Sequence, residues 1–160
     1  MSKGAIYHYF ESKEDILYEA MIGHVRALEI IAVAATAGEG RPEQRLRSLA
    51  RGFMALYAGA ADRQKVLLNE LDRLPRGQRA EIVAIQRKLI DIVKDMIVAI
   101  EPSLGRKSSR AFAVTMLLFG SINWTHTWFD PKGLIGPAAL ADAAVDIVLD
   151  GLPGVARRAK

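Results

Sequence analysis

The sequence predicts an all-α fold made as one compact unit. Apolar residues recur at spacings of three and four through most of the chain, which is the period of a helix, and the β-branched alternation typical of strands is nearly absent. A chain of 160 residues that is 51% hydrophobic is long enough to bury one substantial core and short for two domains of ordinary size. We find no internal repeat, low-complexity segment or linker.

Composition excludes several classes of protein. The formal charge is +4, but acidic residues are interspersed almost everywhere, so the excess is not a polybasic tract. The chain has no cysteine, which excludes a disulfide frame, a thiolate nucleophile and a cysteine-type zinc site, and is compatible with a reducing cytoplasm. It shows no signal-peptide run and no stretch of about 18 uninterrupted apolar residues, so we expect a soluble cytoplasmic protein without a membrane partner.

The N-terminal part predicts a short helix and then a long one. The short helix covers about residues 2–9. The long helix begins at Ser12, whose side chain can cap free backbone N–H groups, with Glu14 and Asp15 placed at its positive end. It should stop at residues 38–40, where two glycines occur.

The middle of the chain predicts three more helices. Pro42 suits the first turn of a helix that ends near Gly59. A shorter helix over about 62–73 is broken by Leu74-Pro75-Arg76-Gly77, and the next runs to Ile100, before Glu101-Pro102.

The C-terminal part predicts two helices of different character. The first, over 108–129, is apolar nearly all round its middle, so it must be covered on more than one side. The last follows Gly136-Pro137 and should stop at Gly151 and Pro153. Its Asp142, Asp146 and Asp150 are spaced by four, and we interpret them as a solvated face.

The stretch SKGAIYHYFESKEDIL, residues 2–17, carries the functional signal. Gly4 and Ala5 are small enough to let a helix approach the floor of a DNA groove, while Ile6 and Phe10, four apart, would anchor it to the core. Donors for phosphates and base edges would come from Lys3, Tyr7, His8 and Lys13. An aromatic helical hairpin with no ligand explains the same residues, and physical reasoning alone leaves the two interpretations about equal.

This stretch resembles the end of the helix-turn-helix of TetR-family repressors, in which a small-residue start, a tyrosine, an aromatic pair and a Ser-Lys-Glu corner recur together. The resemblance implies that the recognition helix is 2–9. It implies base contacts from Lys3, Ala5 and His8, and phosphate contacts from Gly4, Tyr7, Tyr9 and Lys13. Residues 1–11 would then be the remnant of the DNA-binding domain, and 12–155 the ligand-sensing and dimerisation domain.

The sequence departs from the family pattern at its start. The family has two further helices before the recognition helix, and this sequence begins one residue before Ser2. Those helices brace the reading helix, and an isolated helix this short is marginal in water. We therefore expect the 160-residue form to bind operator DNA weakly or not at all, whether through truncation or a misassigned start.

By the same resemblance, the rest of the chain implies a ligand pocket and a homodimer. In the family the last two helices of each protomer pair into a four-helix bundle. That arrangement would cover the apolar helix 108–129, in which Gly120 and Ser121 permit close approach. A monomer whose core uses both faces of this helix is the alternative.

Residues 123–133 resemble, more loosely, the TetR branch whose members respond to acyl-CoA thioesters, so a small hydrophobic effector such as an acyl-CoA is implied. Arg63, Lys65 and Arg73 could then meet its phosphates. For each residue, ordinary packing or a solvated face is the alternative. The pocket-lining candidates are Phe53, Tyr57, Leu67, Leu71, Met96, Met116, Phe119 and Trp124.

The sequence predicts that the protein is not an enzyme and uses no cofactor. His8, His24 and His126 are far apart and lack a helical His or acid partner, and there is no glycine-rich phosphate loop or serine elbow. The predicted function is a transcriptional regulator, a repressor that its effector releases from operator DNA. The alternative is a helical protein-interaction module with neither DNA nor ligand.

Overall fold

The computed structural model describes residue 10 and residues 12–157, and within them the regular elements are all helical. The all-α prediction is therefore confirmed. The predicted helix 2–9 lies outside the described residues. The α-helices are α2 (Lys13–Ala37), α3 (Pro42–Gly59), α4 (Ala61–Asn69), α5 (Arg76–Ile100), α6 (Ser109–Asn123) and α7 (Pro137–Arg157), with 3-10 turns η1 (Leu71–Arg73), η2 (Pro102–Leu104) and η3 (Trp124–Thr127).

Local sequence signals explain how several helices begin. The Ser12 hydroxyl accepts a hydrogen bond from the Asp15 N–H at 3.1 Å, so the predicted cap of α2 is present. Pro42 opens α3, where its missing N–H has no cost, and the chain reaches it through Gly40, whose φ of 105° favours glycine. Ser108 caps α6 by accepting from the Arg110 N–H.

Three predicted boundaries were wrong. The α-helix predicted to reach residue 129 ends at Asn123 and tightens into η3, and the one predicted over 62–73 ends at Asn69 before η1. The last helix does not stop at Gly151: α7 continues to Arg157 with Pro153 inside it. One proline near a helix end removes a single backbone hydrogen bond, so the remaining turns can still form.

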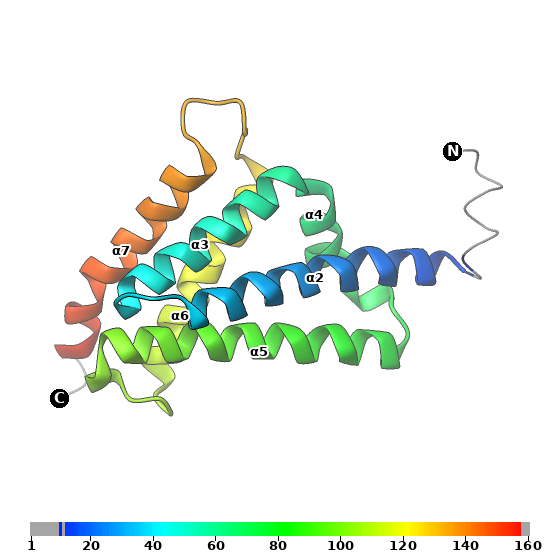
Figure 1. Cartoon of the computed structure of the whole chain (residues 1–160). Coiled ribbons are helices and arrows are strands. Elements are labelled where there is room, and N and C mark those ends of the chain that lie inside the picture. The colour runs from blue at the N-terminus through cyan, green and yellow to red at the C-terminus, as the bar shows by residue number, and fades with distance from the viewer. Residues whose placement is uncertain (1–9, 11, 158–160) are drawn as a thin grey trace.

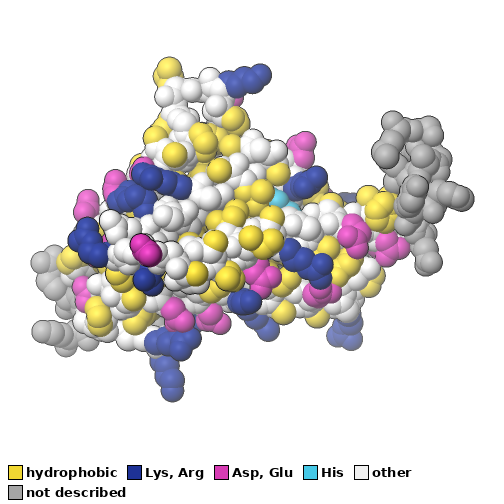
Figure 2. All heavy atoms as spheres, viewed as in Figure 1, with side chains coloured by type: hydrophobic (Ala, Val, Ile, Leu, Met, Phe, Trp, Pro, Cys, Tyr) yellow, Lys and Arg dark blue, Asp and Glu magenta, His cyan; other side chains and the backbone are white. Residues whose placement is uncertain are grey.

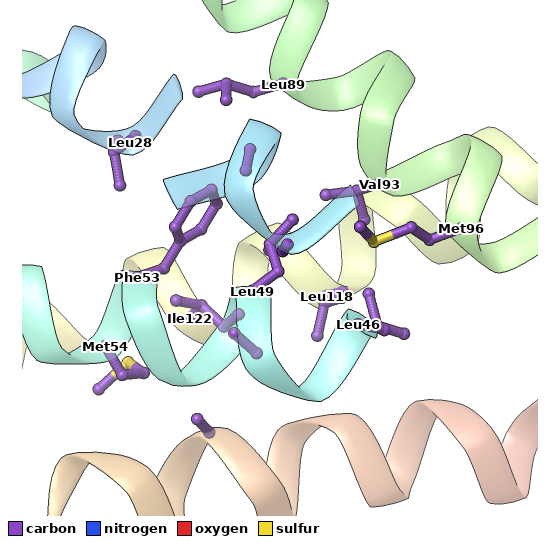
Figure 3. Close-up of a cluster of buried hydrophobic side chains, with 14 of the residues drawn as sticks. Leu28, Leu46, Leu49, Phe53, Met54, Leu89, Val93, Met96, Leu118 and Ile122 are labelled. Atoms are coloured by element: carbon purple, nitrogen blue, oxygen red, sulfur yellow. The ribbon is translucent and has the colours of Figure 1, made fainter. Parts of the chain in front are cut away.

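The helices pack around α3. Helices α2 and α5 lie side by side, α3 contacts both of them, and α7 packs against the outer side of α3 (Figure 1). Side chains from α2, α3, α5 and α6 converge on one buried cluster in which Phe53 is fully buried (Figure 3). Burial of this cluster is the main favourable term holding the helices together.

Helix α2 is long and apolar enough, by length and composition, to cross a membrane. Its apolar residues have another explanation in this fold, because the helix contacts α3, α4 and α5. Its buried residues are Met21, Ile22, His24, Val25, Leu28, Ala32 and Ala35. The apolar character of α2 therefore serves the core.

An ion-pair network fastens α7 to α3. Arg51 binds both carboxylate oxygens of Asp142, with Nε and Nη2 at 2.8 and 2.6 Å. Arg47 reaches Asp142 at 3.2 Å and Asp146 at 2.5 Å. The interpretation of the α7 aspartates as a solvated face was thus wrong for Asp142, whose side chain is 27% exposed between the two arginines of α3. Asp146 is 57% exposed, although it pairs with Arg47, and Asp150 is also exposed, as a solvated face predicts.

The network predicts a pH-dependent contribution to stability. The bond from Arg51 and the neighbouring Arg47 hold the pKa of Asp142 below its usual range, so its contribution is complete above the unfolded pKa of about 3.9 and is lost as the pH falls below it. We expect Asp142→Asn to lower the midpoint of urea unfolding at pH 7, and the deficit to shrink at pH 3. Asp150→Asn is the matched control; an equal deficit in it would contradict the assignment.

Candidate functional site

A cavity of about 240 Å³ lies between α2, α3, α4, α5 and α6. Most of its wall is apolar. Two lining residues, Leu68 on α4 and Met116 on α6, are 38% and 41% exposed, which marks the opening of the cavity between these two helices. The lining residues are Val25, Leu28, Tyr57, Gln64, Leu67, Leu68, Gln86, Leu89, Ile90, Met116, Phe119 and Asn123.

A hydrogen-bonded polar cluster of His24, Tyr57, Gln64 and Asn123 joins four helices beside the cavity. Tyr57 Oη and Gln64 Nε2 both donate to Asn123 Oδ1, at 3.0 and 3.2 Å. Gln64 Oε1 lies 2.7 Å from His24 Nε2. The cluster thus links α2, α4, α3 and α6 in an otherwise apolar interior, where an unpaired polar group is costly.

The directions of these hydrogen bonds determine which ring nitrogen of His24 carries the proton. Because Gln64 donates through its nitrogen to Asn123, its oxygen faces His24, so His24 Nε2 must carry the proton. His24 is 1% exposed, and its Nδ1 has no hydrogen-bond partner among the described residues. Burial lowers the pKa of His24, which keeps the ring neutral.

Tyr57 is also held in its neutral form. Burial raises the pKa of its hydroxyl well above the usual range, so this group acts as a donor at any physiological pH. Its ring packs 6.3 Å, centroid to centroid, from that of Phe53, which in turn lies 6.3 Å from Phe119. The aromatic residues therefore brace one wall while the hydroxyl points into the polar cluster.

A second surface lies on the outer side of α6 and shares Met116 with the cavity lining. This α6 apolar face consists of Phe112, Met116 and Leu117 of α6 together with Trp124, the first residue of η3, and Leu117 is 68% exposed. It continues into a groove shared with the end of α7, where Gly151, Gly154 and Val155 face Leu117 and Val114. Large exposed apolar surfaces of this kind mark interaction sites.

Within the described part of the chain, no group of three or more His, Asp or Glu residues is placed to hold a metal ion. On the face seen in Figure 2, basic and acidic side chains are interspersed, without a field of one sign. The described surface seen there therefore offers no broad basic patch for nucleic acid.

Comparison with known proteins decides the family. The model of the tetracyclin repressor-like C-terminal domain matches residues 39–152. The chain belongs to the TetR family. A TetR-family transcriptional regulator from Bordetella parapertussis 12822 is 38% identical, with a TM-score of 0.89; the match covers 96% of this chain and 80% of that one.

Two more distant structures of TetR-like fold also match. The ketosteroid transcriptional regulator KstR2 of Mycobacterium tuberculosis is 19% identical over 95% of this chain and 79% of its own, with a TM-score of 0.82. AibR in complex with isovaleryl coenzyme A and operator DNA is 23% identical, with a TM-score of 0.76; the match covers 92% of this chain and 80% of that one. At these identities the likeness shows the fold alone. A search of curated proteins finds no match to this chain.

The TetR-family fold brings together only part of the predicted ligand set. Tyr57, Leu67, Met116 and Phe119 line the cavity. The other four do not line it: Phe53 is buried behind the wall, Met96 is in the core, Leu71 lies in η1, and Trp124 is 65% exposed. A binding role for any of the eight stays a prediction.

Sequence reasoning missed the polar lining residues Gln64, Gln86 and Asn123. A signal for one of them existed, since Gln64 stands three residues before Leu67 on the same side of α4, an unusual place for an amide unless it has a buried partner.

The predicted cationic residues lie outside the cavity. Arg63 and Lys65 are exposed on α4, and Arg73 forms an ion pair with Glu70. Lys13 is exposed at the first turn of α2, while Lys3, Gly4, Ala5, Tyr7, His8 and Tyr9 lie outside the described residues.

The neutral state of His24 predicts how stability changes with pH. Because the folded state lowers the pKa of this base below its unfolded value of about 6.5, the contribution is complete above that pH and is lost as the pH falls through it. We expect the wild type to lose more stability than His24→Gln between pH 7.5 and 5.5, measured by urea unfolding. His126→Gln controls for the general effect of removing an imidazole; identical pH profiles for wild type and His24→Gln would refute the assignment.

Proposed function

We propose that residues 12–155 form the effector-binding and dimerisation domain of a transcriptional repressor, which a small hydrophobic effector such as an acyl-CoA releases from operator DNA. The observation that carries this proposal is the apolar cavity enclosed by α2, α3, α4, α5 and α6, with a hydrogen-bonded polar cluster at its side. An apolar cavity with a few convergent polar groups is the usual form of a small-molecule site.

The size of the cavity limits the effector. A volume of about 240 Å³ is below the roughly 300–1,000 Å³ of sites for drug-sized ligands, so it suits a short acyl or aryl group rather than a whole coenzyme A. The nucleotide of an acyl-CoA would remain outside the opening beside Leu68, where the exposed Arg63 and Lys65 of the same helix can meet phosphates. The complex of AibR with isovaleryl coenzyme A supports this chemistry by analogy of fold.

The proposed route from effector to DNA passes through α2. This helix supplies His24 to the polar cluster and Val25 and Leu28 to the cavity, and its N-terminal end adjoins the segment assigned to recognition. An effector that binds one orientation of α2 better than another shifts the population toward it. Coupling free energies of this kind are typically about 1–3 kcal/mol.

The DNA-binding part of the proposal rests on the helix-turn-helix resemblance. Lys3, Ala5 and His8 would contact bases, and Gly4, Tyr7, Tyr9 and Lys13 phosphates, in the form of the protein that carries a complete helix-turn-helix. In a two-fold dimer the recognition helices would enter successive major grooves about 34 Å apart. The repressor would act in the cytoplasm, where its DNA is.

The proposed dimer pairs α6 and α7 with the same helices of a second protomer. The α6 apolar face and the exposed Ile147 of α7 support it, because a four-helix bundle buries such faces. The small residues Gly151 and Gly154 in the adjoining groove allow close approach.

The proposed dimer predicts that a single charged substitution at its interface separates the two protomers. We expect Leu117→Glu to convert a dimer into a monomer, measured by analytical ultracentrifugation at about 10 μM, because it places a carboxylate at the centre of the interface. Ile30→Glu, at an equally exposed apolar residue of α2, is the matched control and should stay dimeric. A monomeric wild type would refute the interface.

The effector hypothesis predicts stabilisation of the chain by isovaleryl-CoA, used here as the probe. We expect it to raise the melting temperature, with free coenzyme A as the negative control, because a ligand that binds only the folded state stabilises it. Leu68→Trp narrows the opening and should weaken binding at least tenfold, whereas Asn69→Trp, at an exposed neighbour outside the cavity, should not.

Operator binding is tested separately, by fluorescence anisotropy with the DNA that flanks the gene. A form with a complete helix-turn-helix should bind it and be released by the thioester, and the 160-residue chain is measured beside it. Absence of DNA binding by both forms would favour the protein-interaction module over the repressor.

A further inference from the structure

The hydrogen bonds of the polar cluster end at Asn123, whose side-chain N–H donors have no acceptor among the described residues. Asn123 Oδ1 accepts from both Tyr57 and Gln64, so its acceptor capacity is used and the orientation of its amide is fixed. The other half of the amide, Nδ2, has no acceptor among the described residues, and Asn123 lines the cavity. The cavity lining therefore includes a held amide group whose N–H donors have no acceptor in the part of the chain that the structure describes.

The lining of the cavity does not favour a charged partner for this donor. Among the described lining residues there is no Lys, Arg, Asp, Glu or His. A carboxylate placed there would lose its hydration without gaining a cation, which is unfavourable. A neutral oxygen acceptor loses less hydration, and one hydrogen bond can replace it.

We propose that Asn123 Nδ2 donates to the oxygen of an uncharged carbonyl, in a thioester, ketone or ester, and that Asn123 thereby sets the specificity of the cavity. The inference rests on the proposed effector cavity and adds the chemistry of its polar contact. The apolar part of the effector packs on Phe119, one turn earlier on α6, and on Leu89 across the cavity.

The fixed orientation is what makes Asn123 selective. A free asparagine side chain can rotate its amide to offer an oxygen instead of a nitrogen, and so can accept from a hydroxyl or an amine. Here that rotation would place Nδ2 against the Nε2 donor of Gln64 and break their hydrogen bond, and Tyr57 would have to turn its hydroxyl to accept. A donor held in one orientation binds ligands that offer an acceptor in preference to ligands that offer a donor. The entropy cost of ordering the Asn123 side chain has already been met on folding.

The test uses three probes with the same carbon frame: propiophenone, propylbenzene and 3-phenylpropanoate. Isothermal titration calorimetry at pH 7.5 measures their affinity for the 160-residue chain and for Asn123→Asp. That variant keeps the oxygen that accepts from Tyr57 and Gln64, two hydrogen bonds that favour its ionised form and that a ligand carboxylate would lack, and the ionised form has no donor. Gln86→Leu is the matched control, since it removes an amide elsewhere on the cavity wall.

We expect the wild type to bind propiophenone and to bind 3-phenylpropanoate at least tenfold more weakly. Asn123→Asp should weaken propiophenone about tenfold while changing propylbenzene less than twofold, a difference that isolates the hydrogen bond. Gln86→Leu should keep the preference for the ketone. If Asn123→Asp does not fold by circular dichroism, Asn123→Leu takes its place with the same expectations.

Two failures are distinguishable. If no probe binds the wild type, the effector cavity itself is refuted, and the proposed function with it. If propiophenone and propylbenzene lose affinity equally in the Asn123 variant, or if 3-phenylpropanoate binds as well as the ketone, the cavity stands and the carbonyl assignment is overturned.

Discussion

The satisfaction of buried polar groups is the constraint on which the interior depends. Tyr57, Gln64 and His24 are side chains that an apolar core accepts only when they are hydrogen-bonded, and each finds its partner on another helix. Hydrophobic burial brings α2, α3, α4 and α6 together but specifies their relative rotation only loosely. The polar cluster adds direction, because a small rotation of one helix would break bonds that water cannot replace.

The same bonds create the cavity beside them. Side chains that are held at fixed positions by hydrogen bonds cannot collapse into a neighbouring gap, as a flexible methionine would. The aromatic contacts of Phe53 with Tyr57 and Phe119 brace the wall from behind. A gap that would be a packing defect elsewhere is therefore compatible here with a stable fold, and it is open to a ligand that restores the missing contacts.

The periodicity of the sequence could predict the elements but not the geometry of the site. The α2 cap at Ser12 and the proline start of α3 depend on neighbours in sequence, so they were predictable. The continuation of α7 past Pro153 was not, because a local stop signal was outweighed by the rest of the helix. Asp142 pairs with Arg51, which lies 91 residues away, and no spacing along one helix reveals such a partner.

The cavity illustrates the same limit for function. Tyr57, Leu67, Met116 and Phe119 were predictable because family resemblance pointed to the apolar faces of their helices, whereas Trp124 follows α6 into η3 and is directed to solvent. Gln64 and Asn123 were missed because their role depends on each other: 59 residues apart, each is an ordinary polar residue until the fold places them 3.2 Å apart.

Helix α6 connects the two proposed activities of the domain. One side of it carries Phe119 and Asn123 into the cavity, while its α6 apolar face is uncovered, and Met116 belongs to both surfaces. An effector that contacts Met116 would therefore act on a side chain that also belongs to the proposed dimer interface, and in that dimer occupancy of the cavity would be coupled to the packing of the two protomers. In the proposed dimer, the distance between the recognition helices would depend on that packing and on the tilt of α2. The effector needs only a differential contact with these two helices, rather than a rearrangement of the core, to change the affinity for DNA.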